Sequence, residues 1–259
     1  MGDATKTAEQ QIRQYEPDPK LLDNRNVLVT GASRGLGRAI STACAQAGAQ
    51  TILLSRNVKQ LDELANEIVT NGGVEPCIVP TDLEGAGVDD YATIASLLNE
   101  RFDGLDGVVL NAGMLGEMAP LASYDPISWA RVFQVNVHSQ FLLLQAMMPL
   151  LERRDDASII FTSSGVARRA RAYWGAYAAS KFATEGMMQI LADELAQAGR
   201  IRVNAINPGR LRTKMRAEAY PAEDPLTLKE PHEITNAYLF LLGRHGRGTH
   251  GMSLDAQAS

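Results

Sequence analysis

Cysteine and histidine are scarce in this 259-residue chain, and neither is arranged to bind a metal. The two cysteines, Cys44 and Cys77, lie far apart in the sequence and lack the short spacing of a zinc or redox pair. We expect reduced thiols in the core of a cytoplasmic protein. The four histidines form neither an HxxxH nor an HExxH pattern, so surface or loop positions are expected for them and no metal site is predicted.

The chain also lacks an excess of basic charge and a long hydrophobic run. Its 25 Lys and Arg are outnumbered by 30 Asp and Glu, and the net charge is −5. Nucleic acid requires a basic surface, so no nucleic-acid partner is expected. No apolar stretch has the length of a membrane span or a signal peptide, so no membrane association is expected. Residues 1–10 are interpreted as a mobile tail and 15–20 as an extended lead-in.

Hydrophobic residues make up 45% of the chain, enough for a large buried core. Short apolar runs alternate with longer helical patterns, and no Pro-, Gly- or Ser-rich linker divides them. This alternation is typical of an α/β fold with a parallel sheet covered by helices on both faces. We expect an N-terminal extension over 1–24 and one domain over 25–259. Strands are predicted at 26–30, 51–54, 77–80, 107–110, 158–162 and 201–206, and helices at about 35–47, 58–70, 88–102, 126–151 and 173–198.

A glycine-rich segment, Thr30-Gly-Ala-Ser-Arg-Gly-Leu-Gly37, directly follows the first predicted strand. Its glycines allow a tight strand-to-helix turn and a close approach of the backbone to a pyrophosphate. The spacing Gly-x-x-x-Gly-x-Gly differs from the general G-x-G-x-x-G fingerprint, and an ordinary tight turn is the alternative. The position after the first strand favours a dinucleotide site, with these candidate residues: Gly31, Ser33, Arg34, Gly35, Leu36 and Gly37.

The end of the second predicted strand indicates which dinucleotide binds. An acidic residue there would select NAD, but the chain reads Leu54-Ser55-Arg56-Asn57. Arg34 and Arg56 could bind a 2′-phosphate, and Ser55 could donate a hydroxyl hydrogen. NADP(H) is therefore expected in preference to NAD(H), with a solvated arginine pair as the alternative. Asp82, followed by Leu83, stands after the third strand, where its carboxylate could accept from the adenine amino group.

Tyr177 and Lys181 are four residues apart in a predicted helix, so their side chains share one face. An ammonium beside a phenol favours the phenolate and should lower the pKa of the tyrosine. Such a pair can act as a proton donor and acceptor. The spacing alone is common by chance, so its meaning depends on the other motifs.

Taken in order, the motifs resemble the short-chain dehydrogenase/reductase family over residues 24–255. They are the glycine-rich turn, Asn111-Ala-Gly113, Asn136, Ser164, Tyr177-x-x-x-Lys181 and Asn207-Pro-Gly209. Residues 174–188 and 251–257 more narrowly resemble bacterial YciK-type oxidoreductases. The resemblance implies a Rossmann-type three-layer fold with a seven-stranded, mainly parallel sheet. It also implies hydride transfer between NADP(H) and a carbonyl/alcohol substrate.

The same resemblance implies roles for individual residues. Tyr177 would be the general acid/base, and Lys181 would lower its pKa and bind the nicotinamide ribose. Ser164 would polarise the substrate oxygen, with neighbouring Ser163 less favoured by spacing. Asn136 would bind a water that links Lys181 to solvent, and an asparagine within a helix suits a local kink there.

Further cofactor contacts and an oligomer are implied in the same way. Asn111, Ala112 and Gly113 would lie beside the adenosine, Pro208 and Gly209 would shape the nicotinamide end, and Thr213 would bind the carboxamide. A homodimer or homotetramer would form through the helices at 126–151 and 173–198.

Basic residues flank the expected substrate position. Arg168, Arg169 and Arg171 lie between Ser164 and Tyr177. Residues 210–230, which would cover the substrate, include Arg210, Arg212, Lys214 and Arg216. These clusters suggest an anionic substrate: a carboxylate, a phosphate or an acyl-thioester carrier. In the alternative, the arginines are solvated or bridge acids of the cover such as Glu218, Glu223 and Asp224. The few apolar residues of that short cover argue against a large sterol-type pocket.

Two other functions fit the fold. A dinucleotide-sensing or scaffolding protein would be favoured if Ser164, Tyr177 or Lys181 were missing, but all three are present. A sugar-nucleotide epimerase or dehydratase usually carries a longer substrate domain after the last predicted strand. An oxidoreductase is therefore the leading prediction.

Overall fold

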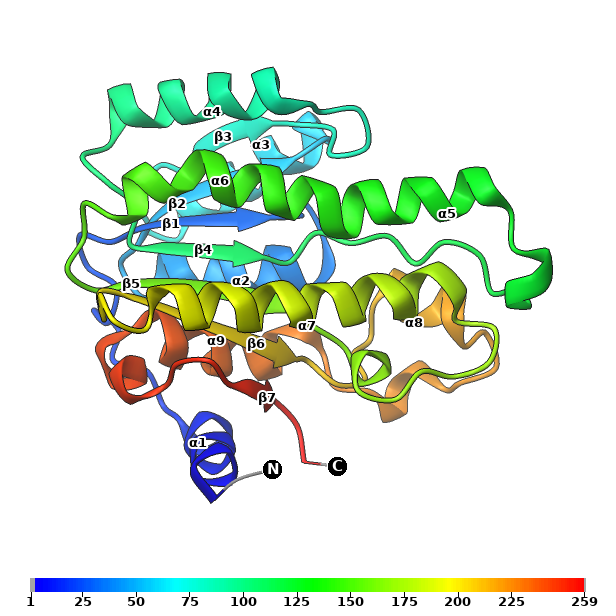
Figure 1. The fold of residues 1–259 in the computed structure, drawn as a ribbon. Helices are drawn as coiled ribbons and strands as arrows, with labels where there is room; N and C mark the ends of the chain where they lie inside the picture. The colour runs from blue at the N-terminus through cyan, green and yellow to red at the C-terminus, as the bar shows by residue number, and fades with distance from the viewer. Residues whose placement is uncertain (1–2, 259) are drawn as a thin grey trace.

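The computed structural model describes residues 3–258 and contains one seven-stranded sheet (Figure 1). The strand order is β3-β2-β1-β4-β5-β6-β7, and every neighbouring pair is parallel. The predicted strands are confirmed to within one residue at either end. The short seventh strand was expected from the family resemblance alone. The strands are β1 (Asn26–Thr30), β2 (Gln50–Ser55), β3 (Cys77–Pro80), β4 (Gly107–Leu110), β5 (Ala157–Thr162), β6 (Ile201–Asn207) and β7 (Ser253–Asp255).

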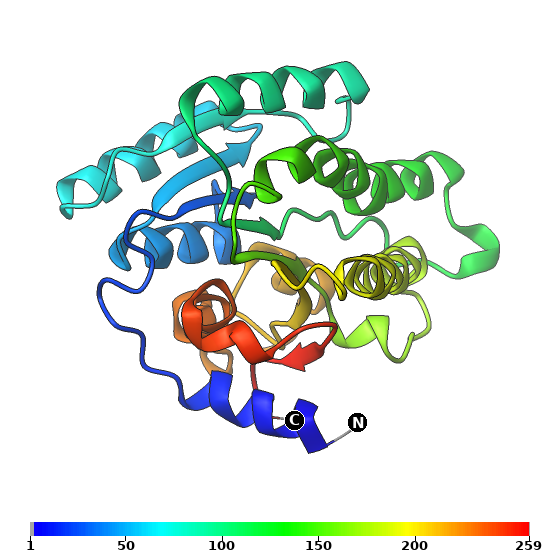
Figure 2. The same cartoon turned by 60° about the vertical axis from the view of Figure 1, so that its left-hand side comes forward.

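Helices cover both faces of the sheet and bury a separate apolar layer on each (Figure 2). On one face lie α2 (Gly35–Gln46), α3 (Val58–Thr70) and α9 (Thr235–Leu242). On the other lie α4 (Val88–Arg101), α6 (Ser139–Leu151) and α7 (Gly175–Leu195). Strands buried on both sides need apolar residues throughout, which explains their continuous runs of Val, Ile and Leu. The predicted three-layer arrangement is confirmed.

The long helix predicted at 126–151 is interrupted in the middle. It consists of α5 (Pro126–Phe133), a π-helical turn (Gln134–His138) and α6. A π-turn inserts one extra residue into the helical ladder and is frequent at functional sites. Asn136 lies in this turn and is fully buried, so the kink expected at this asparagine is confirmed.

The expectation of a mobile tail is wrong for residues 3–10, while residues 1–2 lie outside the described part of the chain. Helix α1 (Asp3–Gln14) packs on α9 and on the edge strand β7 (Figures 1 and 2). Ala8 and Ile12, four residues apart, share the buried face, and Ile12 is only 1% exposed. The polar composition concealed this narrow apolar face.

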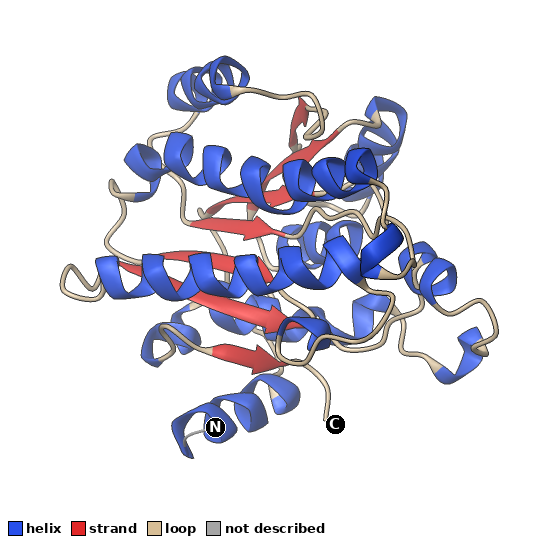
Figure 3. Ribbon diagram, turned by 45° about the vertical axis from the view of Figure 1, so that its right-hand side comes forward, coloured by secondary structure: helices blue, strands red, loops and turns tan. Residues whose placement is uncertain are grey.

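All seven strands point the same way, so their carboxyl ends meet at one edge of the sheet (Figure 3). The chain moves outward from β1 through β2 to β3, and outward from β4 through β5 to β7. The crevice at the carboxyl ends of β1 and β4 is the place where open α/β sheets bind ligands.

Residues 3–258 include no helix that is both long and apolar enough to cross a membrane. Within the same residues, no cluster of His, Cys, Asp and Glu is arranged to hold a metal ion. Cys44 and Cys77 are free and buried, as expected of core thiols, and burial raises the pKa of Cys44 to about 12.

Candidate active site

Two adjoining cavities lie at the carboxyl ends of the strands. The catalytic cavity, about 300 Å³, contains Ser164, Tyr177 and Lys181 in its wall. The arginine cavity, about 260 Å³, lies over the ends of β2 and β3. Together they bring most of the predicted residues into one continuous site, because they share Arg34, Ala112 and Gly113. Also in the catalytic cavity are Gly35, Leu36, Asn111, Pro208, Gly209 and Thr213, and in the arginine cavity Gly31, Ser33, Ser55, Arg56, Asp82 and Leu83.

The glycine-rich turn is closely packed against the end of β4. Gly31 has a φ of +68°, and a Cβ there would lie 3.0 Å from the Cα of Ala112. Gly37 lines neither cavity; a Cβ on it would meet the carbonyl oxygen of Gly31 at 2.2 Å. Gly37 therefore lets α2 approach the turn, while Gly31 and Gly35 form the wall of the site.

Thr30 holds the two strand ends together. The N–H groups of Asn111 and Ala112 donate to its Oγ1 at 2.9 and 3.0 Å. The side-chain amide of Asn111 donates in turn to the carbonyl oxygen of Thr30 at 3.1 Å. Asn111 thus fixes the Asn111–Gly113 segment beside the glycine-rich turn.

The arginine cavity carries two exposed guanidinium groups. Arg56 lies 3.7 Å from Asp82, and both side chains are more than half exposed, so the pair is weak. Arg34 makes no ion pair with any residue of the described chain. The Ser55 hydroxyl donates to Ser33 at 2.9 Å. The cavity is thus ready to accept an anionic group.

Helix α7 places Tyr177 and Lys181 side by side in the catalytic cavity, both buried. The Lys181 Nζ lies 5.7 Å from the centre of the Tyr177 ring and donates to the carbonyl oxygen of Thr162 at 2.7 Å. Burial lowers the pKa of Lys181 to about 8, and the charge of Glu185 opposes this shift.

The expected lowering of the Tyr177 pKa is not present. Burial raises the pKa of Tyr177 above its ordinary value, and a hydrogen bond with Ser164 opposes the shift only in part. Lys181 does not reverse it, because its ammonium donates to the Thr162 carbonyl and is itself destabilised by burial.

Asn136 is held rigidly behind this pair. Its Oδ1 accepts from the N–H of Met114 at 2.7 Å, and its Nδ2 donates to the carbonyl oxygen of Met114 and to Ser180 Oγ, both at 2.9 Å. A Cβ on Gly113 would lie 3.6 Å from Asn136 Oδ1 and 3.9 Å from Lys181 Nζ. Gly113 therefore keeps open the space between the two side chains.

The two adjacent serines differ in their partners. The Ser163 hydroxyl donates to the buried carboxylate of Glu185, which also accepts from Ser253 Oγ at 2.7 Å. Ser164 is half-buried in the cavity wall, and its side chain hydrogen-bonds with Tyr177. This arrangement favours Ser164 as the residue that faces a substrate.

The arginines between Ser164 and Tyr177 do not act as one cluster. Arg168 pairs with Asp255 at 2.7 Å and donates to Ser253 at 3.0 Å, so it is turned to β7 and lines neither cavity. The structure therefore does not support Arg168 as a substrate contact. Arg171 lies in a third hollow beside the catalytic cavity.

Acidic residues pair with much of the positive charge in residues 210–230, which would cover the substrate. This agrees with the alternative interpretation, in which these basic side chains bridge neighbouring acids. Within helix α8 (Lys214–Ala219) and the loop after it, Arg216 makes two hydrogen bonds to Glu223, and Lys214 lies 3.8 Å from Glu218. Asp224, by contrast, caps a short 3₁₀ helix by accepting from the N–H of Leu226.

Sequence reasoning missed Trp174 and Leu115 in the apolar wall of the catalytic cavity. Trp174 lies three residues before Tyr177, and its ring packs against the tyrosine at 5.7 Å between centroids. The three-residue spacing within the predicted helix was the signal that could have revealed this contact. The wall also includes Leu211, Met215 and Ala219.

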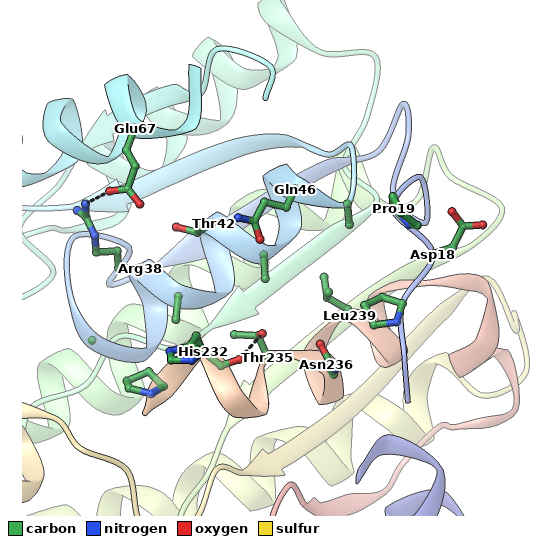
Figure 4. A pocket seen from close by; sticks show the side chains of 16 residues that line it. Asp18, Pro19, Arg38, Thr42, Gln46, Glu67, His232, Thr235, Asn236 and Leu239 are labelled. Atoms are coloured by element: carbon green, nitrogen blue, oxygen red, sulfur yellow. Dashed lines mark hydrogen bonds and ion pairs between the residues drawn. The ribbon is translucent and has the colours of Figure 1, made fainter. Parts of the chain in front are cut away.

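A further hollow of about 760 Å³ lies on the outer side of α2, between the N-terminal lead-in and α9 (Figure 4). Its wall includes Thr42, His232 and Asn236, and Arg38 is paired with Glu67. It shares Gly35 with the catalytic cavity but contains none of the predicted catalytic side chains.

Comparison with known proteins agrees with this geometry. Residues 25–224 match the sequence family described as short chain dehydrogenase. The oxidoreductase YciK of Escherichia coli K12 is 48% identical over 243 residues, covering 94% of this chain and 96% of YciK.

Solved structures of similar proteins include two nucleotide complexes. A short chain dehydrogenase of Escherichia coli CFT073 complexed with NADPH is 49% identical, with a TM-score of 0.91 over 93% of this chain and all of the other. One from Shigella flexneri 2a complexed with NADP is 47% identical, with the same TM-score and coverage. With its own fold and site as described, the chain therefore belongs to the short-chain dehydrogenase family of oxidoreductases.

Proposed function

We propose that this protein transfers a hydride between NADP(H) and a carbonyl/alcohol pair. The observation that supports this most strongly is the meeting of Ser164, Tyr177 and Lys181 in one cavity that continues into the arginine cavity. A dinucleotide-sensing protein would need the arginine cavity but not the buried tyrosine and lysine.

The residues of the site fit a phosphorylated dinucleotide. The turn at Gly31 leaves room for close approach of a pyrophosphate, and Arg34, Arg56 and Ser55 offer donors for a 2′-phosphate. No acidic residue stands at the end of β2 to select NAD. The similar proteins that hold NADPH and NADP add support.

The other cofactor contacts follow from the walls of the two cavities. Asp82 and Leu83 would contact the adenine, and Asn111, Ala112 and Gly113 would lie beside the adenosine. Pro208, Gly209 and Thr213 would border the nicotinamide. When bound, the dinucleotide supplies or accepts the hydride.

Tyr177 is the proton donor in reduction. Since burial raises its pKa, the phenol stays protonated at neutral pH and can protonate a carbonyl oxygen as negative charge develops there. The Ser164 hydroxyl would hold that oxygen. In the reverse direction Tyr177 must first lose its proton, which the positive charge of Lys181 favours.

A proton would be resupplied to Tyr177 from solvent by way of Lys181 and the space beside Asn136. The space that Gly113 leaves between Asn136 and Lys181 has an amide oxygen on one side and an ammonium on the other. A water there could link Lys181 to solvent.

The test is a panel of aldehydes, ketones and 3-oxoacyl thioesters assayed with NADPH and NADH. Tyr177→Phe should lose at least about a hundredfold in kcat, the usual contribution of a general acid, while NADPH binding is retained. Arg56→Glu should weaken NADPH far more than NADH. Absence of NADPH binding at millimolar concentration would refute the proposal, and binding without turnover of any carbonyl would favour a sensor.

We also propose a homodimer or homotetramer formed through α5–α6 and α7. Large apolar side chains are exposed on these helices, Phe141 on α6 and Phe182 and Ile190 on α7. Contact between two copies would remove this surface from water. Sedimentation velocity should give twice or four times the 28.0 kDa chain mass, and a single species of chain mass would contradict the proposal.

A further inference from the structure

The third hollow, which we call the outer basin, opens beside the catalytic cavity. It has a volume of about 620 Å³ and lies between the segment after β5, the start of the cover and the C-terminal residues. Four residues belong to both walls: Ser164, Trp174, Gly209 and Arg216. A molecule whose reacting carbonyl lies at Ser164 and Tyr177 can therefore extend directly into the basin.

Positive charge predominates in the basin, although the whole chain carries −5. Four arginines line it (Arg169, Arg171, Arg210 and Arg216), against two acids (Glu223 and Asp255). A local excess of one sign in a recessed site attracts ligands of the opposite sign.

Both acids of the basin are already satisfied. Glu223 accepts two hydrogen bonds from Arg216, whose guanidinium also lies 3.8 Å from the centre of the Tyr220 ring. Asp255 pairs with Arg168 and accepts from the side-chain amide of Asn207 at 2.8 Å. Neither carboxylate pairs with Arg169 or Arg171.

The arginines of the basin other than Arg216 have weak partners or none. Arg171 Nη1 lies 3.4 Å from the Tyr220 hydroxyl, and Arg210 reaches Glu223 only at 3.9 Å. The Arg169 guanidinium has no ion pair or hydrogen bond to another residue between 3 and 258. Both Arg169 and Arg171 are exposed and line the basin.

On the basis of the proposed function, we propose that the outer basin binds an anionic group of the carbonyl substrate. Arg169 and Arg171 are its ligands, and the group is a carboxylate or a phosphate remote from the reacting carbon. Guanidinium groups present paired N–H donors that match the oxygens of either anion. Arg168, although adjacent in sequence, takes no part because it is bound to β7.

The proposal is tested by binding, independently of turnover. Calorimetry is performed on the Tyr177→Phe variant saturated with NADPH, so that turnover is suppressed and the arginine cavity is filled. The probes are 4-formylbenzoate, its uncharged methyl ester and 4-formylphenyl phosphate. At least one anion should bind tenfold or more tightly than the ester, and the tighter of the two identifies the preferred group.

Adding Arg169→Gln and Arg171→Gln should abolish this preference while the ester and NADPH bind as before. The control pair Arg153→Gln and Arg244→Gln removes the same charge at the opposite end of the sheet and should keep the preference. Equal affinity for anions and ester, no measurable anion binding, or a preference that survives in the basin variant would overturn the proposal. Failure of the proposed function would show separately, as absence of NADPH binding or of turnover in the wild-type protein.

Discussion

At the scale of single residues, the least expected group is the buried carboxylate of Glu185. It lies one helical turn after Lys181, accepts hydrogen bonds from Ser163 and Ser253, and its charge opposes the lowering of the Lys181 pKa. Glu185 therefore positions the serine next to Ser164 and helps keep Lys181 charged. It is a positioning residue, because it acts on the catalytic groups without facing the cavity.

Replacing Glu185 with Gln keeps both acceptor contacts but removes the charge. In the wild-type protein, carbonyl reduction should decline as the pH rises through about 8, where Lys181 loses its proton. In Glu185→Gln the pKa of Lys181 falls further, so the decline should begin at lower pH. Above that pKa, each pH unit by which the profile moves should lower the activity about tenfold relative to wild type. The measurement is kcat/KM for an aldehyde between pH 6 and 10.

Glu194→Gln, an exposed change on the same helix, should leave that profile unchanged. If Glu185→Gln lowers kcat at every pH without moving the profile, the carboxylate acts only through packing.

Residue types in a fixed order, read through the family resemblance, were enough to predict that Ser164, Tyr177 and Lys181 would lie in one cavity. The partners of an arginine cannot be predicted in this way. Arg168 and Arg169 are neighbours in sequence, yet one binds Asp255 on a strand formed 87 residues later and the other faces the outer basin. Long-range contacts of this kind decide the role of a charged side chain.

At the scale of elements, β-strands buried on both faces were predictable and α1 was not. Strand composition follows from burial on two sides, whereas α1 buries only a narrow stripe that includes Ala8 and Ile12. Its contact with the sheet also depends on Glu9, whose Oε1 accepts from the backbone N–H of Asp255 at 3.0 Å. By covering β7, α1 shields the edge of the sheet from pairing with another chain.

Ile12→Ala should lower the free energy of unfolding by about 2–4 kcal/mol, because it removes a fully buried side chain and leaves a cavity. Urea denaturation measures the change, and Gln10→Ala on the exposed face is the matched control. Turnover should be little affected, since α1 contributes to neither cavity. Equal stability of the two variants would mean that α1 does not dock on the domain in solution.

At the scale of the whole molecule, the cavities and a charged cluster lie at opposite ends of the strands. The cavities lie at the carboxyl ends, and the cluster lies at the amino ends. Asp156, just before β5, pairs at 3.0 Å with Arg25, Arg202 and Arg247. Arg25 and Arg202 also donate to the carbonyl oxygens of Leu242 and Leu241 at the end of α9. One carboxylate thus joins β1, β5 and β6 to the last helix.

The Asp156 cluster should make stability depend on acid pH. Although burial opposes it, the charge of Arg202 and the hydrogen bond from Arg25 hold the pKa of Asp156 below its ordinary value. The ionised group therefore stabilises the fold above that ordinary value, about 3.9, and this contribution is lost as the pH falls toward the folded-state pKa. Asp156→Asn should lower the free energy of unfolding by about 2–4 kcal/mol at pH 7, since three arginines lose their partner. The difference from wild type should shrink below about pH 4.

Asp103→Asn provides the comparison, because Asp103 pairs with Arg154 at 2.6 Å while its own side chain is 80% exposed. A solvent-exposed carboxylate is screened by water and salt, so its loss should change stability much less. Denaturation of both variants at pH 7 and at pH 3.5 separates the two cases. If Asp156→Asn is no less stable than Asp103→Asn, or if its deficit persists undiminished in acid, the cluster does not stabilise the fold through the charge of Asp156.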